Sequence, residues 1–264
     1  MDVKIVGDDP LAYKKVAMNC DHRLDTDASR FPMALQSFVS GFNLLINGSS
    51  GSGKTNLLVS LLKSRPDHKK GLRRSFKRIF DNVIIVSPSL KSLKDPVFKG
   101  LKHKYTQFTD EVLDEIVAIL EDVDSSDSDS DSDEAPEKTK TLLVLDDCGS
   151  YLKGAIERRF NHLVKNRRHT PSTLSIICLV QKFKDASTTH RANLTHFITF
   201  KPRNEMEMTS IYDEMIGHPK KYMHEIMNGI FNKRFNHLMV DFTQHHGQGF
   251  MYYSNFRPIE FVPK

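Results

Sequence analysis

The chain has 264 residues, of which 39% are apolar and 27% are charged, and its formal net charge is +5. No apolar run approaches the roughly eighteen residues that a membrane-spanning helix needs, and the first residues contain no apolar stretch typical of a signal peptide. The cysteines at 20, 148 and 178 are far apart and form no CxxC motif, which argues against a zinc site or a disulfide framework. The composition predicts a protein of an intracellular, reducing compartment, with no membrane partner.

Negative charge is concentrated in one stretch of the chain. Nine carboxylates and no lysine or arginine lie between Glu121 and Glu137. Without those nine negative charges, the rest of the chain carries +14 instead of +5. Such an excess is typical of a protein with a nucleic-acid partner. A basic surface that only contacts solvent explains the charge equally well.

The first predicted elements surround a loop rich in glycine and serine. Residues 1–40 mix polar and charged segments, and we interpret them as an N-terminal extension of the main domain. Residues 42–47 form a short apolar run that predicts a buried strand. After the loop, residues 56–63 favour a helix that ends before Pro66.

Further strands alternate with helices along the rest of the chain. Apolar residues recur at helical spacing after Thr109 and again from Ile156. Residues 124–133 contain only aspartate and serine, so the acidic insertion at 122–138 is predicted to be disordered. Buried strands are predicted at 82–87, 141–146, 174–180 and 196–200, and a terminal hairpin at 238–242 with 249–253.

This alternation predicts an α/β fold in which a mainly parallel central sheet is covered by helices on both faces. We divide the chain into the extension 1–40, a core domain 41–215 that contains the insertion, and a C-terminal helix and hairpin at 216–264 that complete the domain. The methionines of the late helical stretch are interpreted as core residues, namely Met206, Met208, Met215, Met223 and Met227.

The loop after the first buried strand, GSSGSGKT, fits the phosphate-binding pattern G-x-x-x-x-G-K-[ST]. Its glycines let successive backbone N–H groups converge on the β- and γ-phosphates of a nucleotide, and the following helix directs its positive end at them. Lys54 is expected to neutralise phosphate charge, and the Thr55 hydroxyl to bind Mg²⁺. The predicted ligands are ATP and Mg²⁺, and the predicted binding residues are Gly48, Ser49, Ser50, Gly51, Ser52, Gly53, Lys54 and Thr55.

A second motif, LLVLDD, occupies residues 142–147. Its apolar run places a strand inside the sheet and delivers two carboxylates to the carboxyl edge, where ligands bind in such folds. Asp146 is expected to hold Mg²⁺, and Asp147 to polarise the attacking water. Gln181 ends the next predicted strand, which we expect to lie beside the LLVLDD strand in the sheet. There it either senses the γ-phosphate or orients water, or it is a solvated residue at a strand end.

Two arginines near strand ends are candidates for contact with phosphate. Arg168 belongs to the segment NRRH at 166–169, at the end of a predicted helix, and Arg191 precedes the strand at 196–200. Each is interpreted either as a residue that contacts the nucleotide of a neighbouring subunit or as a DNA contact. For the nucleotide contact Arg191 is favoured over Arg168, because it lies in a polar segment that follows the Gln181 strand. For Arg167, interaction with the helix dipole is the leading interpretation.

These motifs together resemble the poxvirus-type genome-packaging ATPases of the FtsK–HerA superfamily, which occur in large DNA viruses, virophages and related self-synthesising transposons. The likeness covers residues 40–260 and treats the acidic stretch as an insertion. It rests on GSSGSGKT, on LLVLDD, on NRRH followed by a strand that ends in Gln181, on Arg191 with Asn193, and on the closing region 241–256.

The resemblance implies a P-loop NTPase of the RecA/FtsK–HerA type that works as a homo-oligomeric ring and moves double-stranded DNA into a preformed capsid. It also implies a capsid or portal protein as a partner, and a location in the host cell or the virion. It assigns nucleotide and Mg²⁺ roles to Lys54, Thr55, Asp146 and Asp147, a sensor role to Gln181, and an arginine role to Arg168 or Arg191. One departure is that Asp147 stands where the wider superfamily often has glutamate. Its shorter carboxylate is expected either to slow hydrolysis or to place the water differently, and it keeps the base.

Two other functions are compatible with the same motifs. A P-loop kinase or another small-molecule NTPase has such a loop, but these enzymes usually carry an acceptor site and a lid, which we do not identify in the sequence. A nucleotide-dependent DNA-binding adaptor with little turnover is the other alternative, and the presence of both carboxylates argues against it. Hydrolysis that is stimulated by DNA distinguishes a translocase from both.

Overall fold

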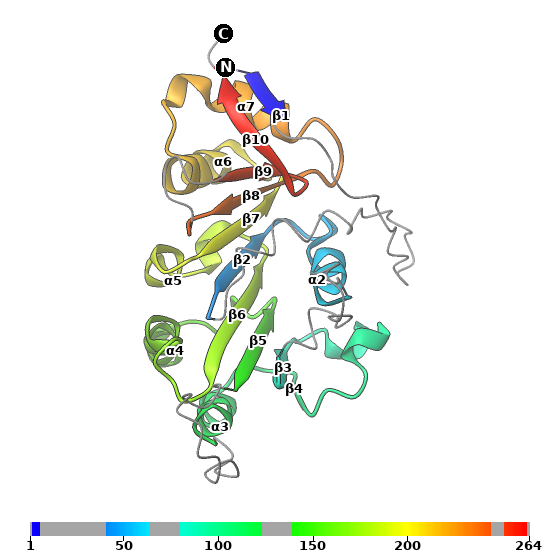
Figure 1. The fold of residues 1–264 in the computed structure, drawn as a ribbon, viewed down its shortest axis with the longest axis vertical. Coiled ribbons are helices and arrows are strands. Elements are labelled where there is room, and N and C mark those ends of the chain that lie inside the picture. Colours follow the sequence, from blue (N-terminus) through cyan, green and yellow to red (C-terminus); the bar gives the residue numbers. More distant parts are fainter. Residues whose placement is uncertain (1, 6–40, 64–79, 123–138, 244–250, 263–264) are drawn as a thin grey trace, which may run out of the picture.

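The computed structural model describes residues 2–5, 41–63, 80–122, 139–243 and 251–262, which form one ten-stranded sheet with helices on both faces (Figure 1). The strands are β1 (Asp2–Ile5), β2 (Asn43–Asn47), β3 (Asn82–Val86), β4 (His103–Tyr105), β5 (Lys140–Asp146), β6 (Thr173–Val180), β7 (His196–Phe200), β8 (His237–Asp241), β9 (Tyr252–Ser254) and β10 (Arg257–Val262). Across the sheet they lie in the order β1-β10-β9-β8-β7-β2-β6-β5-β3-β4.

The six neighbouring strands from β7 to β4 run parallel to one another. Every residue of β2 and β7 is buried, as is every residue of β6 after the first. Continuous burial of this kind is expected for parallel strands that lie between two layers of structure. Because the six strands point the same way, the segments that follow their last residues meet at one edge of the sheet.

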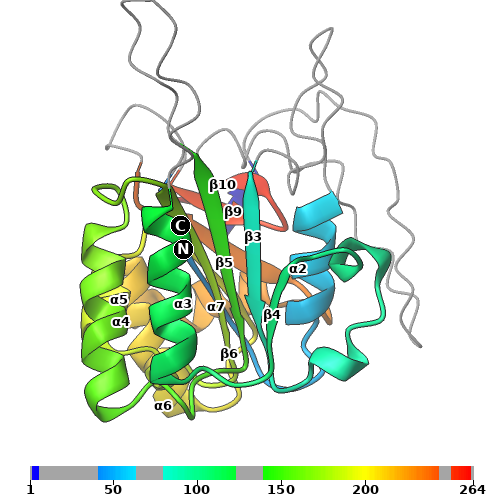
Figure 2. The same cartoon turned by 90° about the horizontal axis from the view of Figure 1, so that it is seen from below.

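Helices cover the two faces of the sheet unequally (Figure 2). They are α2 (Lys54–Lys63), α3 (Asp110–Glu121), α4 (Gly154–Asn166), α5 (Thr188–Ala192), α6 (Glu205–Ile211) and α7 (Met223–Ile230), with 3₁₀ turns at Leu90–Ser92, Pro96–Phe98, Phe183–Asp185 and Lys220–Tyr222 and a π-helical turn at Tyr212–Ile216. Side chains of α3, α4, α6 and α7 share one hydrophobic core with one face of the sheet. On the other face, α2 and the connection from β3 to β4 form a second core.

Helix α3 shows how the local sequence produces these elements. The Thr109 side chain accepts a hydrogen bond from the backbone N–H of Val112 (3.3 Å), which satisfies one of the free donors at the helix start. Acidic residues occupy the first turn, where they favour the positive end of the helix dipole. The buried face of α3 is formed by Leu113, Ile116 and Leu120. The helix predicted after Thr109 is therefore confirmed.

The α/β fold and the buried strands predicted from the sequence are confirmed, and so is the terminal hairpin, because β8 and β9 pair antiparallel. Strands β1, β4 and β10 were not predicted. Strand β1 adds residues 2–5 of the extension to the edge of the sheet by pairing with β10. Residues 6–40 of the extension and 123–138 of the insertion lie outside the described residues, so the domain division stays a prediction.

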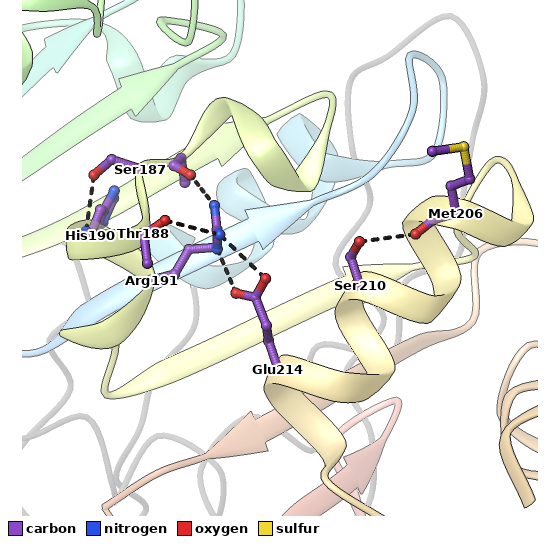
Figure 3. Close-up of polar contacts among 8 residues, drawn as sticks. Ser187, Thr188, His190, Arg191, Met206, Ser210 and Glu214 are labelled. Atoms are coloured by element: carbon purple, nitrogen blue, oxygen red, sulfur yellow. Dashed lines mark hydrogen bonds and ion pairs between the residues drawn. The ribbon is translucent and has the colours of Figure 1, made fainter. Parts of the chain in front are cut away.

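One methionine departs from the predicted core. Met215, Met223 and Met227 are buried, and Met208 packs against the same core, but the Met206 side chain is 79% exposed. Met206 lies in the first turn of α6, off the stripe that buries Ile211, and the close-up shows its side chain extending away from the Arg191 contacts (Figure 3). The prediction was wrong for Met206.

Among the described residues, no helix is long and apolar enough to cross a membrane. Cys148 and Cys178 are buried free thiols, and Cys20 lies outside the described residues.

His190 and His237 are buried in settings that disfavour their charged form, and so is His196, whose Nε2 lies 3.5 Å from Asp241 Oδ1. His190 Nε2 lies 3.0 Å from Asn43 Oδ1, and His237 lies between the rings of Phe200 and Phe256, with centroid distances of 5.5 and 4.7 Å. Desolvation by burial lowers the pKa of His190 and that of His237 from 6.5 to about 4. Both side chains are therefore neutral in the folded protein at neutral pH.

These lowered pKa values predict how stability changes with pH. The unfolded chain takes up protons at these histidines below pH 6.5, whereas the folded chain takes them up only near pH 4. The free energy of unfolding should therefore fall between pH 6.5 and 4, by about 1.4 kcal/mol per pH unit for each histidine. Urea denaturation at pH 7.5, 6.0 and 5.0 measures this change.

A matched pair of variants isolates the contribution of His237. His237→Phe keeps a ring in the aromatic cluster and removes the titrating group, so the acid dependence should become shallower by one histidine. His169→Gln changes an exposed histidine and serves as the control. Equal slopes for both variants would contradict the assignment.

Candidate functional site

The loop between β2 and α2 lies at the carboxyl edge of the parallel strands. The Gly48 N–H donates a hydrogen bond to the Val180 carbonyl (3.2 Å), which links the loop to the end of β6. Within the loop, the Ser52 N–H donates to the Ser49 carbonyl (3.1 Å). Helix α2 begins directly after the loop, so its N-terminal N–H groups lie beside it. This arrangement is suited to binding an anion.

Three glycines of the loop are required by geometry. Gly51 and Gly53 have φ angles of 73° and 106°, in the left-handed region that side chains disfavour. At Gly48, a Cβ atom would lie 2.5 Å from Ser52 Oγ and 3.1 Å from the Phe200 side chain. These three glycines thus occupy positions where a side chain is disfavoured by conformation or by space.

Lys54, the first residue of α2, turns back over the loop. It is buried, and its Nζ donates hydrogen bonds to the carbonyls of Gly48 (2.6 Å) and Ser49 (3.2 Å). Desolvation by burial lowers the pKa of Lys54, and the negative charges of Asp147 and Asp146 partly oppose this shift. The ammonium group is therefore held close to the loop and to both carboxylates.

Asp146, the last residue of β5, is a buried carboxylate. Its Oδ2 accepts a hydrogen bond from Ser87 Oγ (2.9 Å), and Ser87 is fully buried directly after β3. Desolvation raises the pKa of Asp146, the Ser87 hydrogen bond and the Lys54 charge lower it, and the Asp147 charge raises it further. Ser87 was not predicted as a site residue from the sequence. The pattern that could have indicated it is a polar residue directly after a strand that neighbours β5.

Asp147 follows β5 with a φ of 57°, so the chain leaves the extended conformation of the strand at this residue. Its backbone N–H donates to the Leu179 carbonyl (3.1 Å) of β6. The Gln181 side chain donates a hydrogen bond to Asp147 Oδ2. The predicted adjacency of β5 and β6 is confirmed, and Asp147 and Gln181 are brought into direct contact.

The oxygen donors at this edge fit a magnesium ion. Thr55 is the second residue of α2 and is half-buried, and Asp146 offers a carboxylate at the same edge of the sheet. Among the described residues, no group of three or more His, Cys, Asp or Glu side chains is arranged to hold a metal. Mg²⁺ needs fewer protein ligands, because it usually takes one or two from the protein and the rest from phosphates and water.

Arg168 lies away from this edge. It follows α4, whose end leads into the start of β6, at the amino edge of the parallel strands. A Cβ at Gly41, just before β2, would lie 2.9 Å from Arg168 Cγ, which confirms that location. Arg168 is exposed, and it forms no ion pair with another described residue. It therefore does not reach the loop of its own chain.

Its neighbour Arg167 has the structural role expected of it. The Arg167 side chain is buried and donates hydrogen bonds to the carbonyls of Gly41 (2.7 Å) and Val164 (2.8 Å). These hydrogen bonds connect the C-terminal end of α4 to the segment that precedes β2.

Arg191 is held within its own chain (Figure 3). Its guanidinium forms an ion pair with Glu214 through Nε (2.7 Å) and Nη2 (3.3 Å), and it donates to the carbonyl of Ala186. It also lies 4.8 Å from the centre of the Phe183 ring. These contacts join α5 to the π-helical turn after α6, and they were not visible in the sequence.

The edge therefore combines a glycine-rich loop, a lysine that begins the next helix, and two carboxylates on a strand separated from the loop strand by β6. This combination defines a P-loop NTPase. The chain belongs to the family described as Poxvirus A32 protein, whose match extends over residues 35–241. The resemblance read from the sequence is confirmed at the level of the family. No sequence among the curated proteins matches the chain.

Solved structures share the fold. The genome packaging NTPase B204 from Sulfolobus turreted icosahedral virus 2, in complex with ATP-gammaS, has a TM-score of 0.50 and 16% identity over 81% of this chain and 95% of that chain. B204, the DNA-packaging ATPase from Sulfolobus turreted icosahedral virus, gives 0.51 and 14% over 81% and 97%. The pCW3 conjugation coupling protein TcpA with ATPgS gives 0.52 and 12% over 90% and 62%. At these identities the likeness establishes the fold.

The Ser87–Asp146 hydrogen bond predicts a measurable loss of stability. Ser87→Ala removes the donor to a buried carboxylate, so the free energy of unfolding at pH 7.5 should fall by about 1–3 kcal/mol. Ser89→Ala removes an exposed hydroxyl from the same connection and serves as the control. Urea denaturation of the two variants measures the difference, and equal stabilities would show that the hydrogen bond does not stabilise the fold.

Proposed function

We propose that this chain is an ATP-hydrolysing double-stranded DNA translocase, the motor ATPase that packages a viral genome. The observation that carries the proposal is the meeting of Lys54, Asp146 and the Asp147–Gln181 pair at one sheet edge, in a chain of the Poxvirus A32 protein family. The basic charge of the chain outside its acidic stretch supports a DNA partner.

The loop residues Gly48 to Thr55 bind the phosphates of ATP in this proposal. Backbone N–H groups of the loop and of the first turn of α2 donate to the phosphate oxygens. When phosphate is bound, Lys54 exchanges its hydrogen bonds to Gly48 and Ser49 for bonds to phosphate oxygens. Thr55 and Asp146 hold Mg²⁺, which, when bound, neutralises charge on the β- and γ-phosphates.

Asp147 and Gln181 handle the attacking water. Asp147 accepts the proton of the water, and Gln181 orients both the carboxylate and the water through its amide. Asp146 accepts a hydrogen bond from Ser87 and Asp147 accepts one from Gln181, so in this proposal the two carboxylates serve different tasks. Because each carboxylate has its own hydrogen-bond donor, the metal-binding role and the proton-accepting role stay on different residues.

A motor that packages DNA also needs partners. The shared fold of B204, which is described as a DNA-packaging ATPase, supports assigning them by analogy. The chain acts as a homo-oligomeric ring around double-stranded DNA, at a capsid or portal protein, in the host cell or the virion. Hydrolysis that DNA does not stimulate would instead favour a P-loop kinase or small-molecule NTPase. DNA binding with little turnover would favour a nucleotide-dependent adaptor.

The direct test measures ATP hydrolysis with and without double-stranded DNA. Turnover should rise several-fold when duplex DNA is added. Lys54→Ala should lose both nucleotide binding and turnover, because it removes the cation that faces the phosphates. Asp147→Asn should bind nucleotide and lose turnover, because the amide keeps the shape and does not accept the proton. Wild-type turnover in both variants would reject the site.

A ring predicts that an arginine of one subunit acts on the nucleotide of the next. Such a guanidinium is worth about 10³–10⁵ in rate. Both Arg168 and Arg191 are candidates for this role from the sequence. The structure favours Arg168 for this role, because Arg191 would first have to leave its ion pair with Glu214.

Mixing inactive variants tests the arginine. Arg168→Ala keeps its own site, and Lys54→Ala keeps its arginines, so mixed rings of the two should recover partial activity. Arg191→Ala should mainly lower the thermal midpoint, as should Glu214→Ala, and the two losses should not add. Recovery with Arg191→Ala instead of Arg168→Ala would move the role to Arg191. No recovery in rings shown to be mixed would reject both.

A further inference from the structure

The connection between β3 and β4 carries an unusual density of positive charge. We call residues 87–105 the lysine segment, and all of its lysines are exposed, namely Lys91, Lys94, Lys99, Lys102 and Lys104. The same residues contain one carboxylate, Asp95, so the formal charge of the segment is +4. The nucleotide site described above uses none of these lysines.

The single carboxylate of the lysine segment is already engaged. Asp95 forms an ion pair with Lys63 of α2 (2.7 Å), and its other oxygen accepts a hydrogen bond from the Val97 N–H (2.8 Å). None of the five exposed lysines forms an ion pair with another described residue. The surface therefore presents cations without counter-ions from the described chain.

The lysine segment is bonded to the proposed nucleotide site at two points, at Asp146 and at helix α2. Ser87, its first residue, donates the hydrogen bond to Asp146 and also accepts one from the Ser89 N–H (3.2 Å). Asp95 ties the middle of the segment to the last residue of α2, the helix that begins with Lys54. Apolar residues of the segment pack into the core on the α2 face, namely Leu90, Leu93, Val97, Phe98 and Leu101.

We infer that the lysine segment binds the phosphate backbone of duplex DNA and transmits that contact to Asp146 through Ser87. The inference rests on the proposed function and names the DNA surface of that motor. Lysines are point charges on flexible stems, which suits attachment to phosphates without reading sequence. A translocase that passes over any sequence needs this kind of contact.

The chemistry of the segment favours duplex DNA over a single strand. Surfaces that bind single strands usually offer exposed aromatic rings for base stacking. In the lysine segment, Phe98 is buried, and the Tyr105 hydroxyl donates a hydrogen bond to Glu115 (2.7 Å). The exposed part of the segment therefore carries mainly lysine ammonium groups, which bind the phosphates of nucleic acids.

The test uses only part of the lysine set. Lys102 and Lys104 flank or belong to the edge strand β4, where lysine also prevents pairing with other sheets. The test variant is therefore K91Q/K94Q/K99Q. The matched control, K153Q/K165Q/K221Q, removes the same charge from exposed lysines outside the segment. Thermal unfolding of both variants checks that the fold is kept.

Duplex DNA binding is measured for the two variants and the wild type at salt concentrations from 50 to 200 mM. Loss of three phosphate contacts should reduce the slope of log affinity against log salt by about 2–3 units, with at least a tenfold loss of affinity at about 100 mM salt. The control variant should keep the wild-type slope. Equal slopes for the two variants overturn the inference.

ATP turnover separates this inference from the proposed function. Basal turnover of K91Q/K94Q/K99Q should match the wild type, while stimulation by duplex DNA is lost. A wild-type protein that DNA neither binds nor stimulates would defeat the proposed function itself. Full stimulation of the triple variant, with a responsive wild type, would defeat only this inference and leave the surface to an acidic protein partner.

Discussion

The burial of the Asp146 carboxylate at the carboxyl edge of the parallel strands is the constraint on which the site depends. Removing a carboxylate from water costs several kcal/mol unless hydrogen bonds and opposite charge replace the water. Ser87 supplies the hydrogen bond from β3, and Lys54 supplies the charge from the loop. Strand β5 lies between β3 and β6, so partners can reach its last residues from both sides.

The same constraint explains why Lys54 and the carboxylates depend on one another. Burial lowers the pKa of Lys54 and raises that of Asp146, because desolvation disfavours the charged form of each side chain. Each is stabilised in part by the charge of the other. Asp147 adds a second negative charge near this pair, which raises the pKa of Asp146 and partly offsets the desolvation of Lys54. Its own carboxylate accepts a hydrogen bond from Gln181.

The sequence predicts those parts of the structure that depend on local patterns. Continuous apolar runs identified β2, β3, β5, β6 and β7, and the two motifs identified Lys54, Asp146 and Asp147 before any geometry was known. Strands β1 and β10 were missed because they are formed by pairing between the two ends of the chain, with a register such as Val3 to Phe261. Ser87 and the Arg191–Glu214 pair were missed for the same reason, since only the fold brings these partners together.

The fold also separates three kinds of contact in space. The proposed nucleotide-binding residues lie at the carboxyl edge, Arg168 lies at the amino edge, and the lysine segment crosses the α2 face between them. Of these, only the lysine segment is bonded directly to the site, through Ser87 at one end and through Asp95 to α2 in its middle. A displacement of the segment therefore changes either the hydrogen bond to Asp146 or the position of the helix that carries Lys54. If the proposed DNA contact forms, a force on the lysines reaches the site through Ser87 and through the ion pair of Asp95 with Lys63.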